Sequence, residues 1–465
     1  MSPRSLAPGI RGATLVDFLH ARYLGLQLNL SDLLHMNIKN LARRIPESIL
    51  FPLTAYIQTR RVNRAVHMLT EVGKPDLGIV QDQNRFGVNV LGFISRSFGL
   101  GEAVRSTIRG LNAARIPVNT VDIRIDGQRK ATTWAGRLNV SDCHPVSIYH
   151  FNPDVINNLG LEIVSSIYRS STYNIAFWFW ENQVLPKHWL KASELFDEIW
   201  VASSFCKSVM EKHLGKPVFR IPLNVDTNPT LRSERGSMIK ALRDKYVFLT
   251  MLDFNSRAER KNPGGVLDAF EKAFKTGQND VCLIIKIMNS VAGGSELRSL
   301  LKKASKDPRI ILIDGVISRT DLINLMRESD CLVSLHRAEG FGLPIAEAMS
   351  LGIPVIATGW SSNMDFMDSQ NSFPVPYSLK RLSKNARPYP KGTLWAEPDT
   401  DYAARIMRTL AKYPEIGRIR GRRGQKTILG KFNARSTGKA ISERLTAIYS
   451  DLSRINVRVK GVQSP

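Results

Sequence analysis

The chain from residue 86 onward alternates short apolar runs with amphipathic stretches. The apolar runs show little polar alternation, which predicts strands buried on both faces of a parallel sheet, with helices between most of them. We predict a first series of strands over residues 87–94, 118–123, 146–151, 173–180, 198–202 and 218–221. A second series is predicted over residues 246–252, 281–287, 310–313, 330–335 and 354–357. This alternation predicts an α/β fold class with two doubly wound, Rossmann-like domains and a ligand cleft between them.

The chain of 465 residues exceeds one ordinary core, and four parts are distinguished along it. The first part lacks the strand–helix rhythm and predicts an N-terminal helical extension, with short amphipathic helices over 17–28 and 33–44. A polar, charged stretch over 226–244 separates the two Rossmann-like domains. The last part predicts basic helices and a tail, which we place back against the first domain. The four predicted parts cover residues 1–84, 85–235, 236–415 and 416–465.

A glycine-rich turn follows the apolar run 331–335 and carries two glutamates. Glu339 lies on the turn and Glu347 inside the following helix, in which Pro344 suits the first turn. A helix that begins near Leu343 presents free N–H groups and a partial positive charge, which stabilise an anion such as a diphosphate. Carboxylates accept hydrogen bonds from hydroxyls, so the pair predicts a nucleotide-sugar site. The alternative is a glycine turn between core elements with two solvated glutamates.

Two further loops occupy the equivalent place after the first strand of each domain. In the first domain, Gly99 and Gly101 allow close backbone approach to a phosphate or sugar, and Glu102 begins the helix. The loop is not the G-x-G-x-x-G fingerprint, which disfavours a dehydrogenase. In the second domain, Arg260 and Lys261 are expected at the mouth of the cleft, where they neutralise a departing diphosphate. The alternative for this loop is a basic helix start without a ligand.

Polar residues also follow two other predicted strands of the first domain. His150, Asn152 and Asp154 follow one strand and are placed to contact an acceptor or the transferred sugar. Trp180 and Glu181 end an aromatic strand and would supply a sugar platform and a hydroxyl acceptor. Structural roles are the alternative for each of these residues. His336 and Arg337, which precede the glycine-rich turn, are further candidates.

Composition changes this picture mainly through charge. The formal net charge is +24, and residues 401–465 hold 15 basic against 4 acidic residues, with the densest cluster over 418–426. Such a balance predicts an anionic partner, a membrane surface or nucleic acid, although a solvated face is the plain alternative. The four cysteines form no C-x-x-C pair, which predicts structural thiols and neither a disulfide framework nor a zinc site. No secretory signal or spanning segment is recognised, so we expect a cytoplasmic protein.

The segment Glu339-Gly-Phe-Gly-Leu-Pro-Ile-Ala-Glu347 resembles the E-x7-E motif of retaining GT-B glycosyltransferases of family four, in spacing and in intervening residues. The resemblance extends over about residues 86–430. It implies that the first glutamate contacts hydroxyls of the donor sugar and the second contacts the ribose. It also implies that Lys261 binds phosphate, with Arg257 and Arg260 both candidates for the companion arginine. The residues that would approach the sugar and diphosphate are Ser256, Gly340, Phe341, Gly342 and Leu343.

The same resemblance implies a reaction. The chain is similar to bacterial enzymes that build surface polysaccharides, often from mannose donors, through residues 99–102, 335–337 and 360–363. We therefore expect a retaining hexosyltransferase that moves a hexose, with mannose favoured, from a UDP- or GDP-sugar to a lipid-linked or oligosaccharide acceptor. Glu339, Lys261, Arg260 and His150 are the expected catalytic residues. No cofactor and no metal are expected, and the first and second domains become the acceptor and donor domains.

Two other classes of protein remain as alternatives. A phosphorylase-like GT-B enzyme would share the architecture but require a pyridoxal phosphate lysine and a longer chain. A non-enzymatic nucleic-acid binder is suggested by the charge, but an interleaved aromatic–basic motif is lacking and no specific nucleic acid is expected. We expect instead that the positive charge attaches the protein peripherally to the inner face of a membrane, through the basic C-terminal helices and the N-terminal extension. A helical cap on the first domain is the alternative role of that extension.

Overall fold

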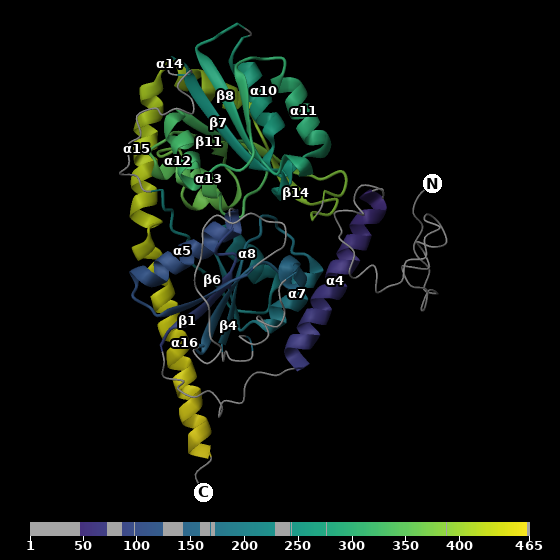
Figure 1. The fold of residues 1–465 in the computed structure, drawn as a ribbon, viewed down its shortest axis with the longest axis vertical. Coiled ribbons are helices and arrows are strands. Elements are labelled where there is room, and N and C mark those ends of the chain that lie inside the picture. The colour runs from purple at the N-terminus through teal and green to yellow at the C-terminus, as the bar shows by residue number, and fades with distance from the viewer. Residues whose placement is uncertain are drawn as a thin grey trace, which may run out of the picture.

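Two six-stranded parallel sheets form the body of the protein, one above the other along its long axis (Figure 1). The computed structural model describes residues 47–71, 86–96, 98–123, 143–158, 168, 173–227, 242, 244–275, 277–386 and 388–462. Each sheet belongs to a Rossmann-like α/β domain, as the alternating pattern predicts. The described strands agree with the eleven predicted ones to within two residues at each end.

The first sheet has the order β2-β1-β3-β4-β5-β6. Its strands are β1 (Val88–Gly92), β2 (Val118–Asp122), β3 (Val146–His150), β4 (Tyr173–Trp178), β5 (Glu198–Val201) and β6 (Val218–Arg220). Its helices are α5 (Gly99–Ala113), α7 (Lys187–Ala192) and α8 (Ser204–His213), with the 3-10 turns η3 (Pro153–Asn158) and η4 (Ser193–Leu195). β1 is flanked by β2 and β3, so the strand order reverses there and the loop into α5 lies at a topological switch point.

The second sheet has the order β12-β11-β10-β7-β8-β9. Its strands are β7 (Tyr246–Asp253), β8 (Val281–Met288), β9 (Ile310–Asp314), β10 (Cys331–Ser334), β11 (Val355–Thr358) and β12 (Phe373–Val375). Its helical segments are η6 (Phe254–Ser256), α9 (Ala258–Lys261), α10 (Pro263–Ala273), η7 (Ser290–Ala292), α11 (Gly294–Ala304), α12 (Arg319–Glu328), α13 (Leu343–Ser350) and η8 (Ser361–Asp365). The loops after β7 and β10 meet at the switch point of this sheet, which brings the two predicted donor motifs together. β12 was not predicted, because it has only three residues and the middle one is Pro374.

A hairpin that the sequence did not predict follows β12. It consists of β13 (Tyr377–Arg381) and β14 (Leu394–Pro398), which pair antiparallel. All five residues of β13 are exposed, so the hydrophobic signal of a strand is absent. The connecting loop is polar, yet its Ala386 and Tyr389 are buried in a hydrophobic cluster of the first domain. The hairpin loop therefore extends from the second domain to the first.

Three helices end the described chain: α14 (Thr400–Lys412), α15 (Pro414–Lys431) and α16 (Ala434–Val462). α15 lies beside the second domain, and α16 continues along the first (Figure 1). Arg444 on α16 forms an ion pair with Glu198 of β5, whose side chain is fully buried. The Tyr449 hydroxyl donates to the Gly87 carbonyl at 2.7 Å. These contacts fix the last helix to the first domain.

One helix, α4 (Glu47–Glu71), is described within the predicted N-terminal extension. Its apolar residues Ile57, Val62, Val66 and Leu69 are buried, and α4 packs against α7, η3 and η4 of the first domain. This contact is that of a helical cap. The short helices predicted over 17–28 and 33–44 lie outside the described residues. Within the described part of the chain, no helix combines the length and the apolar character needed to cross a membrane.

Candidate functional site

The glycine-rich turn after β10 has the predicted local structure. Gly342 is the N-cap of α13 with φ of +89°, a left-handed conformation that glycine adopts without strain, and the helix begins at Leu343 as predicted. A Cβ atom at Gly342 would lie 3.3 Å from that of Asn363, so the position is also sterically tight. Phe341 is buried against the rings of Phe366 and Phe432. The turn is thus held firmly on the second domain.

Glu339 is buried on this turn beside two cations. The ammonium of Lys261 donates to Glu339 Oε1, and Arg260 Nη1 lies 3.6 Å from Oε2. Burial by itself raises the pKa of Glu339, but Lys261 and Arg260 outweigh it and lower the pKa to about 2. Glu339 is therefore a carboxylate at neutral pH. The motifs after β7 and β10, which are 78 residues apart, are in direct contact.

Arg260 contacts both domains and is buried. The sequence had predicted it at the mouth of a cleft. Its Nη1 donates to the Ala338 carbonyl at 2.7 Å, and its Nη2 donates to the Ser256 carbonyl at 3.2 Å. Its Nε lies 3.2 Å from Oε1 of Glu181, which follows β4 of the first domain. Burial opposes the charge of Arg260, but Glu181 and Glu339 outweigh it and raise its pKa. Arg260 is thus a fixed cation between two carboxylates.

Tyr389 completes this group from the hairpin loop. Its hydroxyl donates to Glu181 Oε1, and its ring packs against Trp180 and Trp395 at 5.8 and 5.7 Å between centroids. Sequence reasoning missed Tyr389, because the contact joins residues 208 positions apart through a hairpin that has no strand pattern. We call the following five side chains the interdomain cluster: Glu181, Arg260, Lys261, Glu339 and Tyr389.

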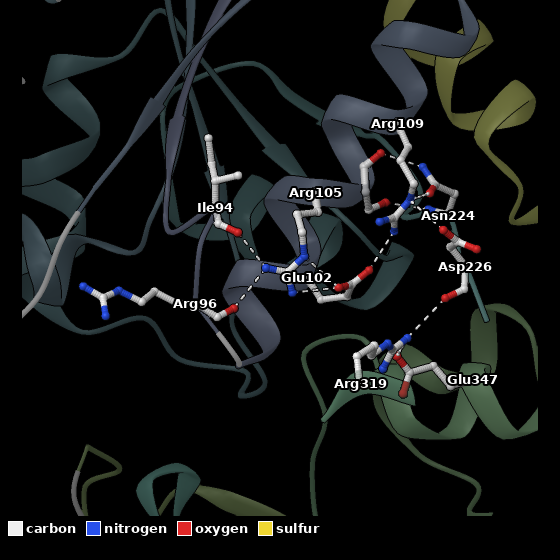
Figure 2. A network of polar contacts seen from close by, with 10 residues as sticks. Ile94, Arg96, Glu102, Arg105, Arg109, Asn224, Asp226, Arg319 and Glu347 are labelled. Carbon is white, nitrogen blue, oxygen red and sulfur yellow. Dashed lines mark hydrogen bonds and ion pairs between the residues drawn. The ribbon is translucent and has the colours of Figure 1, made fainter. Parts of the chain in front are cut away.

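Glu347 lies inside α13 in a different environment. Glu347 is buried. Its partner is Arg319 at the start of α12, whose Nη2 lies 2.6 Å from Glu347 Oε1 (Figure 2). Burial raises the pKa of Glu347, and Arg319 offsets only part of this effect. Arg319 was also missed from the sequence. The available signal was Ser318-x-x-Asp321, an N-capping pattern that places a helix start directly after the loop leaving β9.

The loop after β1 is held by internal contacts. A Cβ atom at Gly101 would lie 2.3 Å from the Arg96 carbonyl oxygen, so the absence of a side chain there is required by packing, whereas a Cβ at Gly99 meets nothing within 4 Å. Arg105 donates to the Ile94 and Arg96 carbonyls at 2.7 and 3.0 Å (Figure 2). The predicted role of Gly99 and Gly101 toward a donor remains a prediction.

The residues predicted to meet an acceptor make contacts within the first domain. Asn152 exchanges two hydrogen bonds with the Phe179 backbone, at 2.9 and 3.0 Å. Asp154 accepts from His188 at 2.6 Å and from the Trp189 indole at 3.1 Å. Trp180 is buried and donates to the Val184 carbonyl. These contacts are structural, and the acceptor role of Asn152, Asp154 and Trp180 remains a prediction.

His150, the predicted catalytic histidine, is buried at the end of β3. Its Nε2 lies 2.8 Å from the Thr107 hydroxyl, and its ring stacks on Phe177 at 4.3 Å. Burial lowers the pKa of His150 to about 3, so the imidazole is neutral at physiological pH. Its Nδ1 has no hydrogen-bond partner among the described residues. A neutral imidazole can exchange a hydrogen bond with a hydroxyl, and the role toward substrate remains a prediction.

The other candidates near the turn are also held in place. His336 is fully buried, and burial lowers its pKa to about 4. Arg337 forms a two-pronged ion pair with Glu397 of β14 at 2.8 and 2.9 Å. Arg257 lies 3.8 Å from Glu259, while Arg260 is in the interdomain cluster. Arg260 is thus the candidate that lies beside Glu339, and which arginine accompanies Lys261 at the diphosphate remains a prediction.

The remaining predicted donor residues lie along the same edge. The Ser256 hydroxyl donates to the Asp253 carbonyl at 2.8 Å. A Cβ atom added to Gly340 would lie 3.8–3.9 Å from Phe179, Trp180 and Glu181, so this backbone faces the first domain. Over the described ranges, no group of three or more metal-ligating side chains is found.

The fold and this site define a class. Two Rossmann-like domains, each with a six-stranded parallel sheet, are the GT-B arrangement, and solved structures with it match most of this chain. HepE of Anabaena, in complex with UDP and glucose, matches 78% of this chain and 100% of its own at 13% identity and a TM-score of 0.56. Sucrose-phosphate synthase from Thermosynechococcus elongatus matches 79% and 100% at 14% identity and a TM-score of 0.60. A glycosyltransferase from Rickettsia africae matches 78% and 99% at 13% identity and a TM-score of 0.54.

A comparison with protein-family models matches a shorter part of the chain. Residues 243–372 match the family described as glycosyl transferases group 1. This segment runs from just before β7 to just before β12 and contains Glu339, Glu347, Arg260 and Lys261. A comparison with curated protein sequences finds no match.

Proposed function

We propose that the protein is a glycosyltransferase whose second domain binds a nucleotide diphosphate sugar. The observation that carries this proposal is a pair of buried carboxylates, Glu339 and Glu347, on either side of the first turn of α13. Lys261 and Arg260 lie against the first of them. The match of residues 243–372 to group 1 glycosyl transferases covers all four residues and supports the proposal.

Each group then has a chemical task. The start of α13 and the ammonium of Lys261 bind the diphosphate and stabilise its charge as it leaves, with Arg260 as a fixed second cation. For this, Lys261 turns from Glu339 toward the phosphate oxygens. Glu339, ionised at neutral pH, accepts hydrogen bonds from hydroxyls of the sugar. Glu347 accepts them from the ribose.

We further propose that transfer retains the configuration of the anomeric carbon. Double displacement requires one carboxylate as nucleophile and a second carboxyl as acid. Glu181 and Glu339 are instead both held by Arg260, at 3.2 and 3.6 Å. This arrangement favours attack from the face that the diphosphate leaves, with the departing phosphate accepting the proton of the acceptor hydroxyl.

The proposed donor is a UDP- or GDP-hexose, and the proposed acceptor is a lipid-linked or oligosaccharide hydroxyl in surface polysaccharide synthesis. The presence of UDP and glucose in the HepE structure supports a nucleotide-hexose donor. Mannose is the sugar that the sequence resemblance favours. His150, at the carboxyl end of β3, is the first-domain group proposed to meet the substrate.

Thermal stabilisation by UDP-, GDP- and ADP-sugars tests the donor. A ligand that binds only the folded protein raises its melting temperature by mass action, so the true donor produces the largest shift. Glu347→Ala is expected to remain folded, raise donor KM and lower turnover. Wild-type activity in this variant contradicts the ribose role. Dependence of sugar transfer on inorganic phosphate would instead reveal a phosphorylase.

Peripheral membrane attachment is a second part of the proposal. Arg418, Arg422, Arg423 and Lys426 on α15 are exposed, so their charges are available to an anionic surface. Arg420 is used internally, because its guanidinium lies 4.2 Å from the centroid of a β12 ring. We expect binding to anionic vesicles at low salt, on the inner face of the membrane. No binding to such vesicles, or tighter salt-sensitive binding to RNA, contradicts this part.

A further inference from the structure

Six residues of alternating charge connect the loop after β1 with the carboxylate of Glu347, through side-chain contacts and the backbone carbonyl of Asp226 (Figure 2). They lie on α5, on the segment that leaves the first domain after β6, at the start of α12 and inside α13. We call them the charge chain. In order, they are Arg105, Glu102, Arg109, Asp226, Arg319 and Glu347.

The links lengthen from the Glu347 end toward Arg109. Arg319 Nη2 lies 2.6 Å from Glu347 Oε1 and donates to the Asp226 carbonyl at 3.2 Å. Arg109 Nε lies 3.9 Å from the Asp226 carboxylate, and Arg109 Nη2 lies 2.8 Å from Glu102 Oε1. The guanidinium of Arg319 is therefore held between the segment that joins the domains and the carboxylate in α13.

Arg319 and Glu347 differ sharply in exposure. The side chain of Glu347 is 3% exposed, whereas that of Arg319 is 42% exposed. A buried carboxylate is strongly disfavoured unless it is paired, and this cation reaches it from the solvent side. Replacement of Arg319 would therefore leave the buried carboxyl of Glu347 without its ion-pair partner. The cost of its replacement falls on Glu347.

The charges around Glu347 act in opposite directions. Burial raises the pKa of Glu347 most, Arg319 and Arg109 lower it, and Glu102 raises it. Asp226 is the remaining charged member of the chain near Arg319. Loss of Arg319 removes the strongest opposing charge, and the carboxyl would then hold its proton to a higher pH.

We propose that Arg319 is a positioning residue for the nucleoside part of the donor, which holds Glu347 as a carboxylate directed at the ribose hydroxyls. This inference rests on the proposed function, because it takes Glu347 as the ribose ligand. Arg319 acts through Glu347 and does not contact the donor.

The test measures the affinity for UDP and for GDP by calorimetry at several pH values between about 6 and about 9. An ordinary carboxyl group is fully ionised over this range, so only a carboxyl with a raised pKa can titrate in it. Arg319→Gln is expected to weaken binding about tenfold to hundredfold near pH 7, the usual range for a hydrogen bond to a charged group, with affinity recovering as pH rises. Arg319→Lys keeps the charge and is expected to follow the wild-type profile. Arg298→Gln, on the exposed face of α11, is the matched control and should change nothing.

Three results overturn the inference. One is an Arg319→Gln profile identical to that of the wild type. Another is an equal, pH-independent loss in the Gln and Lys variants, which indicates a packing role. The third is a further loss when Arg319→Gln is added to Glu347→Gln, because a residue that acts only through Glu347 has no effect in that background. Failure of the wild type to bind either nucleotide instead overturns the proposed function itself.

Discussion

The two glutamates of one turn-and-helix segment show how surroundings decide the chemistry of identical side chains. Glu339 and Glu347 are both buried and lie eight positions apart. Two cations outweigh burial at Glu339, and its pKa falls to about 2. A single contacting arginine does not outweigh burial at Glu347, and its pKa rises. Glu339 is thus a permanent carboxylate within the interdomain cluster, whereas the charge of Glu347 depends on its neighbours.

The largest expected effect concerns the cation at Glu339. Lys261→Ala removes the mobile charge that we assign to the leaving diphosphate, while Arg260 keeps Glu339 ionised. We expect kcat to fall by about 10²- to 10³-fold, the usual cost of losing one group that stabilises developing charge. Steady-state kinetics with the donor found by thermal stabilisation measures this. A change confined to KM would show that Lys261 binds the donor without assisting departure.

The comparison also predicts opposite effects on stability. The pKa of Glu339 is lowered on folding, so its ionisation stabilises the fold above its unfolded pKa, and this stability is lost as pH falls toward 2. Glu339→Gln should therefore destabilise the protein at neutral pH by about 3 kcal/mol, the usual cost of removing one partner of a buried ion pair. The pKa of Glu347 is raised on folding, so its ionisation at neutral pH opposes folding.

Glu347→Gln should accordingly leave the free energy of unfolding unchanged or raise it. Its partner Arg319 stays hydrated, because much of that side chain is exposed. Urea unfolding of both variants near neutral pH measures the difference. Equal destabilisation by the two substitutions would contradict the claim that folding lowers the pKa of Glu339 and raises that of Glu347.

Much of this site was readable from the sequence, and what was missed has a common cause. The strand ends and the helix start at Leu343 follow from apolar runs, and the gathering of the loops after β7 and β10 follows from the rule that ligands bind at the carboxyl ends of parallel strands. The ion pair of Lys261 with Glu339 was not predicted. Tyr389 and Arg319 were missed. Their roles depend on which distant element reaches the site, and neither hydrophobic periodicity nor glycine spacing encodes that.

A smaller effect is expected on the pH dependence of donor binding. Binding that requires both carboxylates weakens on acidification when the first of them is protonated, and that is Glu347, because its pKa is raised while that of Glu339 is about 2. Affinity should fall by at most tenfold per pH unit below the Glu347 pKa. Calorimetry on Glu347→Gln should show no such acid limb, whereas Glu339→Gln should keep it. If donor affinity still falls at low pH in Glu347→Gln, then another group is responsible for that fall.

The smallest effect is expected at the edge of the interdomain cluster. Tyr389→Phe keeps the ring that packs against Trp180 and Trp395 but removes the hydroxyl that donates to Glu181. Loss of one hydrogen bond to a charged group costs about 1.5–3 kcal/mol when it is fully expressed.

Arg260 continues to hold Glu181 in this variant, so we expect only a few-fold fall in kcat/KM and little change in donor affinity. Tyr413→Phe, at an exposed position between α14 and α15, is the matched control and should leave both unchanged. If Tyr389→Phe weakens donor affinity as strongly as Glu347→Gln, then the hairpin loop itself contributes to nucleotide binding. In that case Glu339 and Glu347 do not divide the donor between them, with Glu339 at the sugar and Glu347 at the ribose.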